Sequence, residues 1–427
     1  MDRLRRTINA ATAPSSDHHH QPSSSSSSSP SSSSKLATAS MSSKDLAAQA
    51  KLGLSSVRSK LSRMSSPKDT EVRRKLNAWF PNTLNPVIFG APMLGISNGT
   101  LAAEISKAGG FGLIGGGYDF NTGSAHLTAL AKELTAARKV LGLEEFALTP
   151  LPVGIGFILC HESVGLFEKT VLPLLQEHSP QAVWLFAPDE TKVKPGSLVR
   201  SIVEKLHDSG FMVMFQVGTV AAARQAARDG ADIIIAQGVD AGGHQFASGA
   251  GVVSLVPEVV AMLGEPEFVG REIVVVAAGG ISDGRGVAAA LALGAEAAVM
   301  GTRFLVATEA STPDFRRKLV LETSDGGAST VKSTFHDDVQ GTVIWSKLYD
   351  GRAIIGSSYQ DHAKGVSLEE NVKLFKDAKE AGDNSRMVTW AGTGVGLVKE
   401  ASPAGDIVRD TREVAKQRIQ FLQQTFL

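Results

Sequence analysis

The sequence predicts an α/β protein whose main domain is a (β/α)8 barrel of the TIM type. Short apolar, β-branched runs alternate with segments of helical period, and this alternation repeats eight times between Val87 and Gly301. Strand–helix alternation implies parallel strands joined by right-handed crossovers, and eight strands favour closure into a barrel. Abundant glycine and few aromatic residues suit a chain with many tight strand–helix turns. A doubly wound open sheet is the structural alternative.

The predicted strands are short apolar runs, most of them bounded by glycine or polar residues. Ser197 can cap the start of one of the intervening helices, and Gly230 and Gly294 can end two others. The strands are expected at Val87–Ala91, Phe111–Ile114, Val153–Ile158, Ala182–Phe186, Met212–Val217, Ile233–Gln237, Ile273–Ala278 and Ala297–Gly301. The helices are expected at Thr100–Ala108, Ser124–Leu141, Val164–Glu177, Ser197–Asp208, Val220–Asp229, Val253–Leu263 and Gly286–Leu293.

Three regions follow from the change in pattern along the chain. Residues 1–70 contain two serine runs and too little apolar surface to offset the entropy of ordering, so they are expected to be a disordered tail, with a transient helix over 47–61. Residues 71–310 form the barrel. Residues 311–427 are expected to pack on the barrel near its mouth as a small mixed lobe, with strands or extended loops at 333–335 and 341–345 and helices at 368–381 and 406–422.

Composition excludes several classes of protein. The formal net charge is zero and charged residues make up 20% of the chain, so nothing indicates binding to nucleic acid or to an anionic membrane. No apolar stretch approaches the ~20 residues of a membrane span. The single cysteine, Cys160, fits a reducing compartment, and a cytoplasmic location is expected. The basic, hydroxyl-rich start weakly resembles a transit peptide, which leaves mitochondrial targeting open, and a homodimer is compatible with the sequence.

The segment Asp240–His244 is the first candidate for chemistry. It follows the predicted strand Ile233–Gln237, and two adjacent glycines, Gly242 and Gly243, let the backbone come close to another group. His244 then stands at the carboxyl end of a barrel strand, where enzymes of this fold keep their catalytic groups. A turn that merely contains a histidine is the alternative interpretation.

A phosphate site is predicted at the ends of the last two strands. Gly279 and Gly280 follow one strand, and Gly301 and Thr302 follow the next. Exposed backbone N–H groups beside a helix N-terminus bind anions, and these strand ends commonly carry phosphate in barrels. Asp283 could cap the adjacent helix and Arg285 or Arg303 could add positive charge; alternatively, the glycines only turn corners.

The end of the first strand, Ala91-Pro92-Met93, can form one wall of a planar ligand site. Gln216 and Gln237 end the fifth and sixth strands and can supply a donor and an acceptor to a heterocycle, although satisfied core amides are the commoner fate. His161-Glu162 and His336-Asp337 lack the spacing of metal ligands. The loop Gly392–Gly396 matches only a loose glycine pattern and is not interpreted as a dinucleotide fingerprint.

Five ordered motifs between about residues 86 and 308 together resemble the nitronate monooxygenase family, formerly called 2-nitropropane dioxygenase. The lobe with residues 345–354 resembles the fungal branch less specifically, and the first 70 residues share nothing with the family. The motifs are Ala-Pro-Met-Leu-Gly (91–95), Gly-Gly-Phe-Gly-Leu-Ile-Gly-Gly-Gly (109–117), Gln-Gly-Val-Asp-Ala-Gly-Gly-His (237–244), Ala-Ala-Gly-Gly-Ile-Ser-Asp-Gly (277–284) and Met-Gly-Thr-Arg-Phe (300–304).

The resemblance implies a barrel that holds non-covalent FMN. It places Ala91, Pro92 and Met93 along the flavin ring, and it brings Gln237 and Gly242 close to the cofactor. Gly279, Gly280, Gly301 and Thr302 would contact the phosphate, and His244 matches the family's active-site histidine. Bacterial relatives often carry an asparagine in the third strand, which here reads Val-Gly-Ile-Gly-Phe (153–157), so another group must replace that contact.

The expected reaction is oxidation of an alkyl nitronate or nitroalkane by O2 to a carbonyl compound and nitrite. In that reaction His244 would take the α-proton of a neutral nitroalkane or hold the charge of a nitronate. Two alternatives remain open: an FMN-dependent NAD(P)H reductase acting on an enoyl thioester or a quinone, and a non-catalytic flavin-binding sensor. The barrel is common to all three, so the site has to distinguish them.

Overall fold

The computed structural model describes residues 76–143, 149–188 and 197–427. The described residues all belong to one compact unit. The predictions for the Ser-rich tail at 1–70 and for a transient helix at 47–61 lie outside the described residues. In the described part of the chain, no helix is long and apolar enough to cross a membrane.

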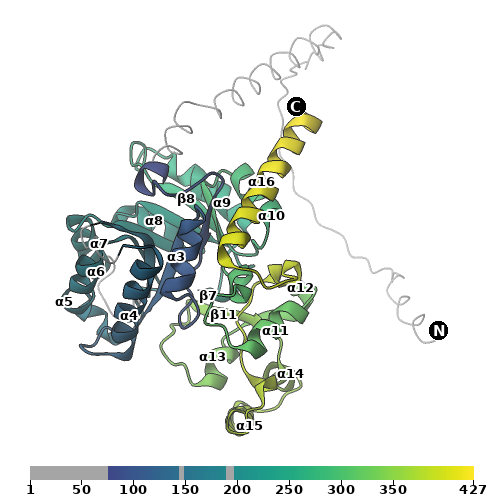
Figure 1. Ribbon diagram of the computed structural model, residues 1–427. Coiled ribbons are helices and arrows are strands. Elements are labelled where there is room, and N and C mark those ends of the chain that lie inside the picture. Colours follow the sequence, from purple (N-terminus) through teal and green to yellow (C-terminus); the bar gives the residue numbers. More distant parts are fainter. Residues whose placement is uncertain (1–75, 144–148, 189–196) are drawn as a thin grey trace, which may run out of the picture. The chain divides into compact units, whose positions relative to one another are not determined.

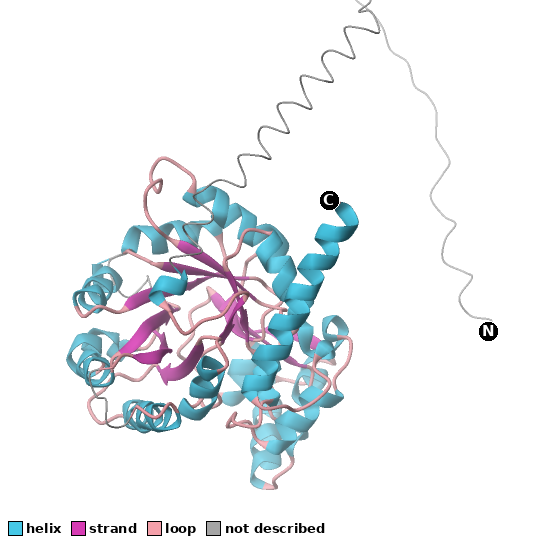
Figure 2. Ribbon diagram, turned by 45° about the horizontal axis from the view of Figure 1, so that its top comes forward, coloured by secondary structure: helices cyan, strands magenta, loops and turns pink. Residues whose placement is uncertain are grey.

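Eight parallel strands form the predicted barrel, in the order β1-β9-β8-β6-β5-β4-β3-β2. Figure 2 shows these strands at the centre of the molecule with helices around them. The circle is completed between β1 and β2 by a parallel bridge from Phe89 to Phe111. The strands are β1 (Val87–Gly90), β2 (Gly112–Gly117), β3 (Leu151–Ile158), β4 (Pro180–Phe186), β5 (Met212–Val217), β6 (Ile233–Gln237), β8 (Val274–Ala278) and β9 (Ala297–Met300). The predicted fold class is therefore confirmed.

The helices between the strands agree with the prediction, with one exception. The single helix expected over 164–177 is instead three short pieces, because Pro173 lies in the first turn of α6 and starts a new helix there. The pieces are η1 (Glu162–Leu166), α5 (Phe167–Thr170) and α6 (Leu172–His178). The other helices are α3 (Gly99–Lys107), α4 (Ala125–Val140), α7 (Ser197–Asp208), α8 (Val220–Asp229), α9 (Val252–Leu263) and α10 (Gly284–Ala292).

The helix next to α10 in the outer ring comes from the end of the chain. Figure 1 shows α16 (Ala404–Phe426, yellow) lying beside α10 and α3. The contact with α10 is close: a Cβ at Gly284 would lie only 2.4 Å from the carbonyl oxygen of Thr411 in α16. On the same helix the buried Arg412 donates hydrogen bonds to four carbonyl oxygens near β1 and α3, those of Leu84, Pro86, Ala108 and Gly109. Residues 301–403 are thus inserted between β9 and α16.

The inserted residues form a lobe around a small antiparallel sheet in the order β10-β11-β7. The third strand, β7 (Gly243–Phe246), belongs to the barrel loop after β6, where the sequence predicted only a loop. In this sheet His244 pairs with Gly351 of β11. The remaining elements are η2 (Thr302–Val306), α11 (Asp314–Glu322), α12 (Gly326–Ser329), β10 (Thr330–Ser333), α13 (Phe335–Gln340), β11 (Tyr349–Ile354), α14 (Ser357–Ala363), α15 (Leu368–Glu380), η3 (Asn384–Arg386) and η4 (Thr393–Leu397).

One detail of the lobe differs from the sequence prediction. The segment expected to be extended over 333–335 ends as strand at Ser333, and Phe335 already begins α13. The segment 341–345 is a loop, which is one of the two alternatives expected there. The boundary between barrel and lobe at residue 310 stays a prediction.

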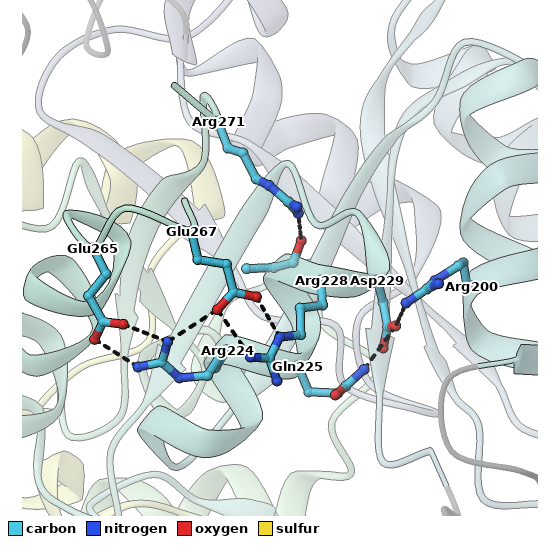
Figure 3. Close-up of polar contacts among 9 residues, drawn as sticks. Arg200, Arg224, Gln225, Arg228, Asp229, Glu265, Glu267 and Arg271 are labelled. Carbon is cyan, nitrogen blue, oxygen red and sulfur yellow. Dashed lines mark hydrogen bonds and ion pairs between the residues drawn. The ribbon is translucent and has the colours of Figure 1, made fainter. Parts of the chain in front are cut away.

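Opposite-charge pairs hold the outer surface of the barrel near α8, as Figure 3 shows. Arg224 contacts both carboxylate oxygens of Glu265 at 2.7 Å, and Arg228 contacts those of Glu267 at 2.7 and 3.0 Å. The guanidinium of Arg224 also lies over the buried ring of Phe268. None of these side chains lines the cavity described below, so the network is assigned to the packing of the outer ring.

Candidate active site

A cavity of about 420 Å3 opens at the carboxyl ends of the barrel strands, beneath the lobe. Its walls come from the ends of all eight barrel strands and from the inserted residues 302–394. Its lining includes all ten residues predicted as site residues: Ala91, Pro92, Met93, Gln237, Gly242, His244, Gly279, Gly280, Gly301 and Thr302. It also includes aromatic and apolar side chains that leave the walls mostly non-polar: Leu94, Ile96, Tyr118, Phe157, Ile158, Trp184, Phe186, Ile281, Val299, Leu305, Ile344, Trp345 and Trp390.

His244 is held on three sides. Its Nε2 lies 2.9 Å and 3.0 Å from the two carboxylate oxygens of Asp337 in α13. Its ring stacks on Trp345, with centroids 3.8 Å apart and an interplanar angle of 14°, and lies 4.7 Å from the ring of Trp390. The side chain keeps 18% of its surface exposed. An imidazole fixed in this way can donate or accept a proton at its other ring nitrogen.

Asp337, Trp345 and Trp390 were missed as site residues by the sequence analysis. Asp337 was considered only as a metal ligand, and in the described residues no group of three or more His, Cys, Asp or Glu could hold a metal ion. No local signal identifies these three side chains, because they reach His244 only through the pairing of β7 with β11. The adjacent His336 donates from Nε2 to the carbonyl oxygen of Val331 at 3.2 Å, and burial lowers its pKa.

Gln216 and Gln237 form one chain of side-chain amides across the floor of the cavity. The indole N–H of Trp184 donates to Gln216 Oε1 at 3.1 Å, and Gln216 Nε2 donates to Gln237 Oε1 at 2.7 Å. Both amide nitrogens also contact the carbonyl oxygen of His244, at 3.4 and 3.3 Å. Gln216 is thereby satisfied within the protein, whereas Gln237 keeps one N–H for a ligand.

The two glycine corners predicted to bind phosphate lie in the same part of the cavity. Gly279 and Gly280 have φ angles of +106° and +72°, a left-handed conformation that favours glycine. In the described part of the chain, no backbone acceptor pairs with the N–H groups of Gly279, Gly280 or Gly301. These free donors, on two neighbouring strand ends, form a concave surface suited to an anion.

Two of the expected charges are not in this corner. Asp283 caps α10 by accepting from the N–H groups of Arg285 and Gly286, as predicted. Arg285, however, turns back to pair with Asp283, and Arg303 donates to the carbonyl oxygen of Glu400. Neither arginine lines the cavity. The prediction that they supply positive charge there is therefore wrong, because each has a nearer acceptor.

The loop Gly392–Gly396, set aside in the sequence analysis, covers this corner. The N–H of Gly392 donates to Thr302 Oγ1 at 3.0 Å, and Thr393 Oγ1 donates to Asp240 Oδ1 at 3.2 Å. A Cβ at Gly242 would lie 2.4 Å from the backbone of Ala391. The glycines at 242 and 392 therefore serve close backbone contact between the barrel loop and the lobe, a role that no dinucleotide pattern describes.

The wall formed by the end of β1 explains the unusual sequence of β3. A Cβ at Gly156 would lie 2.4 Å from Cβ of Pro92, so the proline ring occupies the space of a side chain at this position. Met93 follows Pro92 into the cavity lining, and its backbone N–H donates to Ser97 Oγ. Gly156 of β3 thus makes room for Pro92 in this wall.

Comparison with known proteins identifies the family. The family model described as nitronate monooxygenase matches residues 187–413. A nitronate monooxygenase of Neurospora crassa is 62% identical over 356 residues, which are 82% of this chain and 94% of that protein. The chain belongs to the nitronate monooxygenase family. Within the family, the nitronate monooxygenase npaC of Metarhizium robertsii is 34% identical over 81% of this chain and 95% of its own length.

The solved structure of FabK from Thermotoga maritima has the same fold as this member of the nitronate monooxygenase family. Its TM-score is 0.62 at 25% sequence identity, and the match covers 82% of this chain and 98% of that chain. Nitronate monooxygenases are oxidoreductases and flavoenzymes. The resemblance stated from the five motifs is therefore confirmed at the level of the family, the fold and the class of enzyme.

Proposed function

We propose that the protein uses FMN to oxidise alkyl nitronates and nitroalkanes by O2, giving a carbonyl compound and nitrite. The observation that carries the proposal is the meeting of His244 and the two glycine corners in one cavity. The high identity to the nitronate monooxygenase of Neurospora crassa supports the same reaction. FMN supplies the redox chemistry with the substrate and O2, and the protein supplies binding, orientation and electrostatics.

The residues present fit FMN. The cavity volume lies within the range of about 300–1,000 Å3 that is usual for small-ligand and cofactor sites. In this proposal the flavin ring lies against Ala91, Pro92 and Met93, where Pro92 closes one wall. Gln237 and Gly242 would contact the ring edge, because the amide of Gln237 keeps an unused N–H and Gly242 has no side chain.

The phosphate would lie at the backbone N–H groups of Gly279, Gly280 and Gly301, which have no backbone acceptor among the described residues. The hydroxyl of Thr302 accepts from Gly392 N–H and so has its own proton to donate to a phosphate oxygen. Since no arginine or lysine side chain lines the described cavity, backbone dipoles and hydroxyl groups would provide most of the attraction for the anion.

In this proposal His244 takes the α-proton of a neutral nitroalkane, or donates a hydrogen bond to a nitronate that is already charged. A positioned base of this kind contributes about 10²–10⁴-fold to the rate. The aromatic and apolar walls exclude water around the reacting carbon and suit substrates with short alkyl groups.

The test begins with purified protein in air. The released cofactor is identified by chromatography against authentic FMN, and ethyl nitronate is added while nitrite, acetaldehyde and O2 uptake are measured. We expect FMN as the cofactor and formation of nitrite together with acetaldehyde.

Two results would replace the proposal. FMN binding without nitrite from any nitronate would favour a flavin-binding sensor. Oxidation of NADH coupled to an enoyl thioester or a quinone, again without nitrite, would favour a reductase on the same barrel.

A further inference from the structure

The bond between His244 and Asp337 distinguishes the two ring nitrogens of the imidazole. Both oxygens of the Asp337 carboxylate lie within 3.0 Å of Nε2. Since an ionised carboxylate only accepts hydrogen bonds, the neutral imidazole carries its proton on Nε2. The lone pair of the neutral ring is then on Nδ1, for which no partner is found among the described residues.

Asp337 has no other hydrogen-bonding partner for its carboxylate within the described chain. The side chain is 8% exposed, and the hydrogen bonds to its two oxygens come from His244. A buried carboxylate with so few partners is costly unless a positive charge stands beside it. The carboxylate can therefore hold Nε2–H of the ring after His244 has accepted a proton at its other nitrogen.

The aromatic rings fix the plane of the imidazole. Trp345 stacks on one face at 3.8 Å, and Trp390 lies against the ring at 4.7 Å and 52°. The π face of an indole attracts a cation, so these contacts add to the stabilisation of a charged ring. With the faces covered and Nε2 occupied, Nδ1 is the ring nitrogen left to react.

We propose that Asp337 is a positioning residue that keeps the proton of His244 on Nε2 and makes Nδ1 the atom that abstracts the substrate's α-proton. The inference rests on the proposed function. In the step, the C–H bond of the neutral nitroalkane breaks, the proton moves to Nδ1, and the electron pair stays on the substrate as its nitronate. Asp337 then holds the imidazolium through Nε2–H.

The proposal separates two substrates that differ by one proton. Nitroethane must lose a proton to His244, whereas ethyl nitronate has already lost it. Asp337→Asn removes the negative charge and offers an N–H to Nε2. This favours the tautomer of His244 that carries its proton on Nδ1, where it cannot accept the substrate's proton. For the FMN-loaded variant we expect kcat/KM to fall about 10²-fold or more with nitroethane, and less than about 3-fold with ethyl nitronate. The isotope effect with α-dideuterated nitroethane should rise, because C–H cleavage becomes slower.

Matched variants separate positioning from stability. Asp338→Asn changes an exposed neighbour in the same helix and should leave both substrates unaffected. In a His244→Asn background, the further change Asp337→Asn should not lower kcat/KM for nitroethane any further, because the two residues act as a unit. If Asp337→Asn does not fold, Asp337→Glu retains the carboxylate and should show a smaller loss that is again confined to nitroethane.

Equal losses on both substrates, or no loss on either, would overturn the inference. Failure of the wild-type protein to form nitrite from either substrate would instead reject the proposed function itself, so the two failures are distinguishable.

Discussion

A single imidazole receives its surroundings from three parts of the chain that lie far apart in sequence. His244 comes from the loop after β6, Asp337 from α13 and Trp390 from the end of the lobe. The glycines at 242, 279 and 280 were predictable as positions where a side chain does not fit, because a Cβ at Gly242 would lie 2.4 Å from the backbone of Ala391 and both Gly279 and Gly280 have positive φ angles. Asp337 was not predictable, because its contact with His244 depends on tertiary pairing that leaves no local pattern.

The role of His244 predicts a selective loss of activity. His244→Asn should retain FMN and lose most turnover of neutral nitroalkanes, by about 10²–10⁴-fold, since among the described residues His244 is the only histidine that lines the cavity. Steady-state kinetics with nitroethane measures this, and the absorption spectrum reports the flavin content. His362→Asn, a change of an exposed histidine of α14, should keep wild-type kinetics. Normal nitroethane turnover in His244→Asn would show that His244 is not the base.

The phosphate corner predicts a charge effect on cofactor affinity. Gly301→Asp would place a carboxylate beside the phosphate, while a Cβ at Gly301 has only ordinary contacts, at 3.5 Å from Cβ of Ala91 and 3.9 Å from Sδ of Met93. We expect FMN affinity to fall about tenfold or more, corresponding to about 1.4 kcal/mol. Gly301→Asn has the same shape without the charge and serves as the control. Fluorescence titration of the apoprotein with FMN gives the dissociation constants.

Gly279→Asp should also lose FMN, but this variant tests charge less cleanly. At Gly279 the positive φ and a Cβ placed 2.6 Å from the carbonyl oxygen of Gly238 would strain any side chain. Equal FMN affinity in Gly301→Asp and Gly301→Asn would argue against a phosphate at this corner.

At the scale of elements, the order of strands and helices was readable because each strand is a short β-branched run and each crossover has a helical period. The role of α16 was not readable. Its apolar face predicts a helix but does not say that the helix lies beside α10 and α3 in the barrel's outer ring. The strand β7 was missed because Gly242 precedes it and Gly243 begins it, and adjacent glycines predict a turn rather than a paired strand.

The packing of α10 on α16 predicts a loss of stability on a small substitution. Gly284→Ala would bring a methyl group within 2.4 Å of the Thr411 carbonyl oxygen, so the helices must separate. We expect the free energy of unfolding to fall by about 1–3 kcal/mol, the usual cost of overpacking. Denaturant unfolding measures it, and Gly165→Ala, where a Cβ would meet nothing within 4 Å, is the control. An unchanged midpoint would mean that α16 does not pack this tightly.

At the scale of the whole molecule, the histidines outside the site set the response to acid. Burial lowers the pKa of His336, and burial is also the main reason for the lowered pKa of His126 and of His178. The native state then binds these protons less readily than the unfolded chain does. Their contribution to stability is full above the unfolded pKa of ~6.5 and is lost as the pH falls. His207 acts in the opposite direction, because its hydrogen bond to Asp232 raises its pKa.

Three lowered values against one raised value predict that the protein is less stable at about pH 5 than at about pH 7.5. Thermal unfolding of the FMN-loaded protein at the two pH values measures this. His336→Gln should reduce the difference, because this ring is only 3% exposed and burial lowers its pKa in the native state. The partly exposed His207, whose pKa is raised, should add a smaller contribution to stability that is larger at pH 5 than at pH 7.5. Greater stability at pH 5 would contradict the conclusion that the histidines with lowered pKa values dominate the response to acid.

The central claim is that this cavity holds a flavin which a nitronate reduces. Anaerobic rapid mixing of the purified holoprotein with ethyl nitronate, and separately with NADH, tests the claim most directly. The account predicts that ethyl nitronate removes the visible absorption of the bound flavin within the turnover time and that NADH does not. Rapid loss of that absorption with NADH, and none with ethyl nitronate, would contradict it.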